Sequence, residues 1–69
     1  MPPANGHARG APGKPHHQGW DEALADALQN ASQLGPPGTY EVDVEFSATV
    51  EVHNPGTIQG YAVKLNPHP

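Results

Sequence analysis

The chain has 69 residues, no cysteine and a formal net charge of -4 at neutral pH. This length allows one domain, and a chain without cysteine has neither disulfides nor cysteine-ligated metals to stabilise it. All seven acidic residues lie within positions 20–69, where Lys64 is the single fixed positive charge, so repulsion from phosphates argues against nucleic-acid binding. No apolar run approaches the roughly 18 residues of a membrane span, and no secretory signal is visible. We therefore expect a cytoplasmic protein that binds neither nucleic acid nor membrane.

The N-terminal segment, residues 1–18, is rich in proline and glycine, and Met1 is its one large apolar residue. Such a segment buries too little surface to offset its ordering entropy, so we expect a disordered arm. The arm carries His7, His16 and His17. Because a flexible chain holds no ligand in fixed geometry, we predict no metal site here.

Residues Trp20 to Leu34 are predicted to form a helix. Apolar residues recur with the i, i+3, i+4, i+7 spacing of one buried stripe, namely Trp20, Ala23, Leu24, Ala27, Leu28, Ala31 and Leu34. Gly19 is the expected N-cap. Gly35 fits a left-handed C-cap, and Pro36 with Pro37 then prevents continuation of the helix.

The strongest pattern in the chain is a strict alternation from Tyr40 to Val52. Even positions are apolar and odd positions are polar, which predicts one long strand with a dry face and a wet, acidic face. The dry face consists of Tyr40, Val42, Val44, Phe46, Ala48, Val50 and Val52.

A turn and a second strand follow. Pro55 and Gly56 suit the two central positions of a type II turn, so Thr57 to Leu65 should run back antiparallel to the first strand. Ile58 is out of phase with the later apolar residues of this strand. A bulge at Gly60 would restore the register.

These elements predict an α+β fold, in which one amphipathic helix packs on a long antiparallel β-hairpin in the order α-β-β. The domain spans residues 19–66, between the arm of residues 1–18 and a tail of residues 67–69. Burial in so small a domain returns about as much free energy as ordering costs, and both strands keep an unpaired edge that invites another chain. We therefore expect a homo-oligomer whose interface and core include Val44, Phe46, Val50, Tyr61 and Val63.

Part of the chain resembles the dodecin family. Trp20 with the following run DEALADALQNA resembles the dodecin helix, and a long strand, a turn and the run GYAVKL from Gly60 to Leu65 follow in the same order. Dodecins are small β-α-β-β proteins that assemble into hollow dodecamers; some store flavin, and some also bind coenzyme A. The resemblance covers residues 19–66 and implies self-assembly.

The chain departs from the dodecin pattern at two points. Dodecins begin with a strand, and here the Pro/Gly-rich arm holds that place. Their flavin-stacking tryptophan and their flavin-binding glutamine fall at Thr39 and Ala62 of this chain, and neither residue can do that work. The resemblance therefore implies a shortened dodecin-like module without flavin binding, and we expect no cofactor.

Two further groups of residues are candidate sites. Trp20 either stacks on a ligand ring or closes the core at the helix start, and its phase with Leu24 and Leu28 favours the core. The acidic face of the long strand either binds a cation such as calcium or is simply solvated, and the solvated face is the simpler interpretation. Its carboxylates are those of Glu41, Asp43, Glu45 and Glu51.

The sequence gives no support for catalysis. His53 lies beside the turn without a second ligand at a known metal spacing, and Ser47 and Thr49 have no histidine nearby in the sequence to activate them. No catalytic, cofactor or metal site is predicted, and we do not expect an enzyme.

The sequence thus predicts a non-enzymatic self-assembling module whose role is storage or sequestration of a small ligand at subunit contacts. The alternative is an adaptor that binds a protein partner by accepting a strand at its exposed strand edge. A large homo-oligomer in solution favours the first function, and a monomer that becomes ordered with a partner favours the second.

Overall fold

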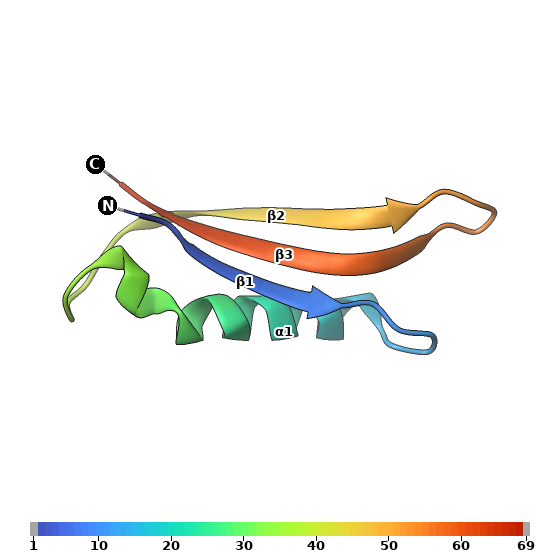
Figure 1. The fold of residues 1–69 in the computed structure, drawn as a ribbon, viewed down its shortest axis with the longest axis horizontal. Coiled ribbons are helices and arrows are strands. Elements are labelled where there is room, and N and C mark those ends of the chain that lie inside the picture. Colours follow the sequence, from blue (N-terminus) through green and yellow to red (C-terminus); the bar gives the residue numbers. More distant parts are fainter. Residues whose placement is uncertain (1, 69) are drawn as a thin grey trace.

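The computed structural model describes residues 2–68, and this part of the chain forms a helix-covered antiparallel sheet (Figure 1). The elements in chain order are β1 (Ala4–Arg9), α1 (His16–Gln29), the 3-10 helix η1 (Ala31–Leu34), β2 (Val42–Glu51) and β3 (Thr57–Pro67). The strand order is β1-β3-β2, and both pairings are antiparallel. The fold is α+β as predicted, but its order is β-α-β-β.

Strand β1 corrects the expectation of a disordered arm over residues 1–18. The strand alternates small and polar residues, so that Ala4 and Gly6 are buried and the polar residues between and after them are exposed. Gly6 lies so close to α1 that an added Cβ would overlap backbone atoms of Ala23 and Ala27. Close packing against the helix therefore stabilises a strand whose composition has little β-propensity of its own.

Helix α1 begins at His16, earlier than the predicted start at Trp20. Pro15, in an extended conformation, is the N-cap. Gly19, the predicted N-cap, is instead buried inside the helix, where an added Cβ would overlap the ring of Tyr61. The apolar period marks the buried stripe of the helix, so it could not reveal a first turn made of polar residues.

The predicted hairpin is formed by β2 and β3. Thr49 pairs with Gly60 but Val50 pairs with Ile58, so Gln59 is the extra residue of a bulge beside Gly60, as the sequence predicted. The prediction of a type II turn is wrong, because Gly56 does not have the positive φ that this turn requires. Strand β3 continues to Pro67, into the segment predicted as a tail.

The hydrophobic core lies between α1 and the part of the sheet formed by β1 and β3. Its buried residues are Ala4, Ala23, Ala27, Leu34, Tyr61, Val63 and Leu65. Strand β2 contributes none of the buried residues in the described chain, although Val42 is partly buried against the core. The helix therefore packs on β1 and β3, whereas the sequence predicted that it packs on the hairpin of β2 and β3.

Candidate assembly surface

Strand β2 carries its apolar side chains on the same face of the sheet as the core. In the register of the hairpin, Val44 lies opposite Leu65, and Phe46 lies opposite Val63. The core residues on β3 are almost fully buried, whereas Val44 is 43% exposed and Phe46 58% exposed. On this face of the sheet, α1 thus covers the central strand β3 but leaves β2 exposed.

The open apolar face continues to the tip of the hairpin. Val50 is 54% exposed, and Val52, just after the end of β2, is 92% exposed. This part of the hairpin extends beyond the end of β1 (Figure 1), which pairs no further than Gly60. We call the row of Val44, Phe46, Val50 and Val52 the apolar ribbon. Exposed apolar side chains that follow one another along a strand are typical of an interaction site.

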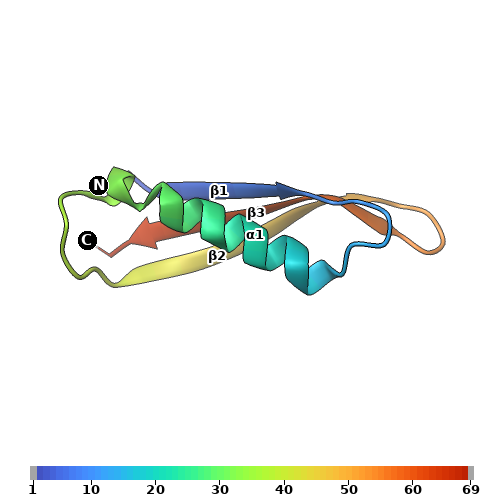
Figure 2. The same ribbon diagram turned by 90° about the horizontal axis from the view of Figure 1, so that it is seen from below.

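The position of α1 explains why the ribbon is open. The helix crosses the sheet diagonally, and its C-terminal half lies over β1 (Figure 2). Gly6 and the helix alanines allow a very close approach on that side, so the helix is drawn towards β1. Leu28, on the flank of the helix, is 58% exposed as a result.

Trp20 is the contact between the helix and both strands of the hairpin. Its ring is perpendicular to that of Phe46, with the centroids 5.6 Å apart, and nearly perpendicular to that of Tyr61, with the centroids 4.8 Å apart. Trp20 is partly buried and packs against the core. These two edge-to-face contacts give Trp20 a role in packing the helix on the hairpin.

The five residues predicted for the interface and core fall into two groups. Tyr61 and Val63 on β3 are buried in the core of the single chain, and Val44, Phe46 and Val50 on β2 are exposed. The last three lie together on one face, because they alternate along one strand.

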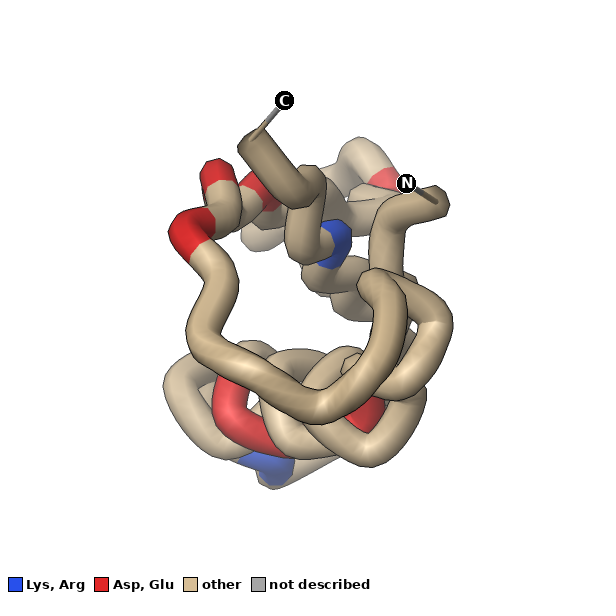
Figure 3. Tube along the Cα trace, turned by 90° about the vertical axis from the view of Figure 1, so that its left-hand side faces the viewer, with Lys and Arg blue, Asp and Glu red and all other residues tan. Residues whose placement is uncertain are grey.

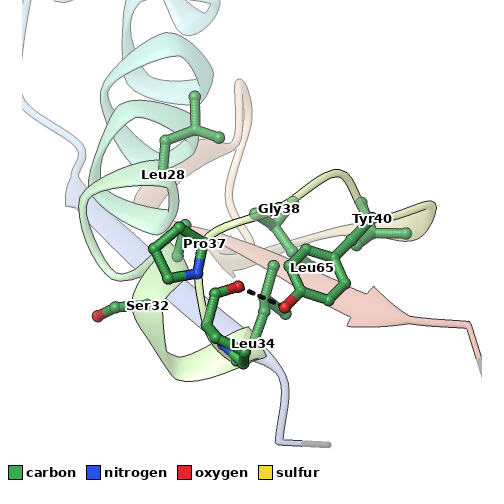
Figure 4. A pocket seen from close by; sticks show the side chains of 11 residues that line it. Leu28, Ser32, Leu34, Pro37, Gly38, Tyr40 and Leu65 are labelled. Carbon is green, nitrogen blue, oxygen red and sulfur yellow. Dashed lines mark hydrogen bonds between the residues drawn. The ribbon is translucent and has the colours of Figure 1, made fainter.

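An apolar hollow lies beyond the C-terminal end of α1, with a volume of about 460 Å³. It is lined by Leu28, Ala31, Ser32, Leu34, Gly35, Pro36, Pro37, Gly38, Tyr40, Val42 and Leu65. The Tyr40 hydroxyl donates a hydrogen bond of 2.5 Å to the carbonyl oxygen of Pro36 (Figure 4), so this polar group is satisfied within the wall. The hollow therefore suits an apolar group.

The two outer edges of the sheet differ. Along β1, the backbone N–H of His7 donates to Asp26 Oδ2 at 2.9 Å, and Asn30 Nδ2 donates to the carbonyl oxygen of Asn5 at 2.9 Å. Side chains of α1 and of its C-cap thus bind two backbone groups at the edge of β1. Strand β2 has β3 on one side and, within residues 2–68, no strand on the other. The edge of β2 is therefore the open edge of the sheet.

The acidic residues of the predicted wet face, Glu41, Asp43, Glu45 and Glu51, lie on β2 or just before it, and Figure 3 shows acidic positions where the strand begins. In the hairpin register, Glu45 is opposite Lys64 and Asp43 is opposite Asn66. His68 Nε2 lies 3.2 Å from Asp43 Oδ1. Residues 2–68 contain no group of three potential metal ligands close enough to share an ion.

The remaining candidates do not come together as a reactive group. His53 Nε2 is 3.3 Å from Thr57 Oγ1 across the turn. His7 and Ser47 lie in one row across the sheet, but both pair with Ala62, which stands between them. Two strand spacings of about 4.8 Å each separate His7 and Ser47, so their side chains are too far apart for direct proton transfer.

The sequence interpretation missed Asp26 and Asn30 as functional residues of the fold. Asp26 is on α1 and Asn30 is its C-cap, so their i, i+4 spacing puts both on one side of the helix, but their role depends on β1, which was not predicted.

Comparisons with protein-family models, curated proteins and solved structures find no match for this chain. Within residues 2–68, no helix has the length and apolar character needed to cross a membrane.

Proposed function

We propose that this chain is a non-enzymatic, self-assembling module of dodecin-like design. The observation that carries the proposal is the apolar ribbon of β2, which shares a face with the core but is not covered by α1. Removing such a surface from water is favourable by about 25 cal/mol for each Å² buried. A second copy of the chain is always available to bury part of it.

The order of elements supports the same proposal. The resemblance implies a β-α-β-β chain, and β1 occupies the place before the helix where the sequence suggested that the first dodecin strand was missing. The positions that would bind flavin hold Thr39 and Ala62, so the assembly we propose is colourless and free of flavin. The apolar hollow beyond α1 is the place proposed for a small stored ligand.

The mass of the protein in solution at two concentrations tests the proposal. Static light scattering should give a homo-oligomer for the natural chain. Phe46→Asp places a charge on the exposed apolar ribbon and should give a monomer that keeps its helical circular dichroism, because Phe46 is not part of the buried core. Ala25→Asp, on the exposed side of α1, adds the same charge elsewhere and should leave the oligomer intact. A natural chain that is monomeric at both concentrations would contradict self-assembly.

The second candidate function is a partner-binding adaptor, favoured by the open edge of β2. An extended segment of another protein can add a strand to such an edge through main-chain hydrogen bonds. A monomer whose amide spectrum becomes sharper only on addition of a partner peptide supports this function over self-assembly.

A further inference from the structure

We propose that two copies of this chain join through the open edges of their β2 strands, antiparallel, with Phe46 opposite Phe46 of the second copy. This inference rests on the proposed self-assembly and specifies its contact. The two sheets become one continuous sheet with both helices on the same side of it, so the two apolar ribbons lie side by side and each covers a flank of the other.

The choice of edge follows from the difference between the two sides of the sheet. On β1, Asp26 already accepts from the N–H of His7, and Asn30 already donates to the carbonyl oxygen of Asn5. Strand β2 has 10 residues, contains no proline and is regular, because the bulge residue Gln59 is on β3. The edge of β2 is therefore long, free and suited to pairing.

Symmetry and the two faces of β2 restrict the register. A closed pair of identical edges has a two-fold axis, so the β2 strands run antiparallel. Residues directly opposite each other in a sheet point to the same face. An apolar position must then lie opposite an apolar position, which requires the two-fold axis to pass through a residue and not between two residues.

Charge selects one of these registers. With Phe46 on the two-fold axis, Glu45 lies opposite Ser47 of the second copy, and Asp43 lies opposite Thr49. Each carboxylate thus faces a hydroxyl that can donate a hydrogen bond to it. The apolar residues pair as well, because Val44 lies opposite Ala48 and Val42 lies opposite Val50.

Each neighbouring register places acid opposite acid, which is destabilising. If the two-fold axis passes through Glu45, Glu45 faces Glu45 of the second copy. If it passes through Val44, Asp43 faces Glu45. If it passes through Ser47, Asp43 faces Glu51, and if it passes through Ala48, Glu45 faces Glu51. The register through Phe46 has no opposed acids from Val42 to Val50, and its only opposed acids, Glu51 and Glu41, lie at the two ends of the paired segment, where Glu41 is outside β2.

Cysteine cross-linking tests this register, and the chain contains no cysteine of its own that could interfere. Directly opposite Cα atoms are about 4.5–5.5 Å apart, within the range of a disulfide. Oxidation of an equimolar mixture of Val44→Cys and Ala48→Cys chains should give a disulfide-linked dimer on a non-reducing gel. Each variant oxidised alone should stay a single chain, because each faces the other position.

Ser47→Cys alone is the register control. In the proposed register it faces Glu45 of the second copy, so it should not cross-link with itself. Efficient self-linking of Ser47→Cys would move the axis to residue 47 and overturn the assignment. A natural chain that is oligomeric by light scattering, but whose Val44→Cys and Ala48→Cys mixture does not cross-link, would overturn the β2 contact and leave self-assembly standing. A monomeric natural chain would overturn both.

A charge substitution tests the contact without cysteine. Ser47→Glu puts a carboxylate opposite Glu45 at two symmetric places in each pair, and it should weaken the association about tenfold. Gln33→Glu, exposed on η1, adds the same charge away from β2 and should have no such effect. Equal association of the two variants, measured by analytical ultracentrifugation, would contradict pairing in this register.

Discussion

The rings of Trp20 and Phe46 are perpendicular, with their centroids 5.6 Å apart, and through this contact α1 reaches β2. The same indole lies against Tyr61 on β3. Trp20 therefore holds together one buried aromatic residue and one exposed aromatic residue, at the boundary between the core and the apolar ribbon.

This contact predicts that Trp20→Ala destabilises the fold. The loss should be about 3 kcal/mol, at the low end for removal of a large aromatic ring, because Trp20 is only partly buried. Urea denaturation followed by circular dichroism measures it. Leu28→Ala, on the same stripe but largely exposed, should cost clearly less. Equal stability of Trp20→Ala and the natural chain would mean that the indole is free to stack on a ligand.

The close approach of β1 to α1 predicts a large effect of Gly6→Val. Any Cβ at this position overlaps backbone atoms of Ala23 and Ala27, and backbone cannot move aside as a flexible side chain can. We expect a loss of at least about 3 kcal/mol, the upper range for overpacking, measured by thermal and urea unfolding. Gly38→Ala is the matched control, because the nearest atom to its added Cβ is 3.9 Å away. If Gly6→Val is as stable as the natural chain, β1 lies further from the helix than it does in this structure.

The capped edge of β1 predicts faster hydrogen exchange after Asp26→Ala. Loss of the carboxylate removes the 2.9 Å acceptor of the His7 N–H. The exchange rate of the His7 amide should rise in nuclear magnetic resonance spectra, and stability should fall by about 1 kcal/mol. Amides of the β2–β3 ladder serve as the internal control and should keep their rates. Unchanged exchange at His7 would show that the edge is protected by other means.

A pH dependence follows from the contact between Lys14 and Glu22. Hydrogen bonds from the Lys14 ammonium, at 2.6 Å, and from the Gln18 amide hold the pKa of Glu22 below its ordinary value. A lowered folded-state pKa stabilises the fold fully above the unfolded pKa, and this contribution is lost as the pH falls through the folded pKa. The melting temperature of Glu22→Gln should therefore fall less on acidification below about pH 4.3. If the melting temperatures of Glu22→Gln and the natural chain fall equally with pH, Glu22 does not contribute this pH-dependent stability.

Removal of residues 1–10 should abolish cooperative unfolding. These residues include β1, whose Ala4 is completely buried, and the strand pairs with β3 from Ala4–Leu65 to Arg9–Gly60. Circular dichroism during heating measures the effect. If the truncated chain keeps the melting temperature of the natural chain, residues 1–10 are a disordered arm, as their composition suggested.

Much of the fold could be predicted from periodicity. The alternation around Phe46 identified β2, and the phase change between Ile58 and Tyr61 located the bulge within one residue. These patterns are strong because large apolar side chains must leave water on one face. The exposed and buried members of the predicted interface could not be separated, because that division depends on where the helix lies across the sheet.

Strand β1 was missed because its inward residues are Ala4, Gly6 and Ala8, which contribute little buried area and have low strand propensity. The signal was present as an alternation with Asn5, His7 and Arg9. This alternation becomes informative only when the surface of α1 is known, because small residues on β1 allow the backbone of α1 to come close. Tertiary packing thus decided a segment whose local preferences pointed elsewhere.

The asymmetry of the sheet also sets a limit on growth. A fibre needs two adhesive sides on every unit, so that each addition exposes a fresh one. Here Asp26 and Asn30 bind backbone groups of β1 at the edge that a third molecule would require, and in the pairing that we propose the edge of β2 is used by the first contact. We therefore expect strand addition to stop at a pair, although an exposed apolar strand remains on each chain.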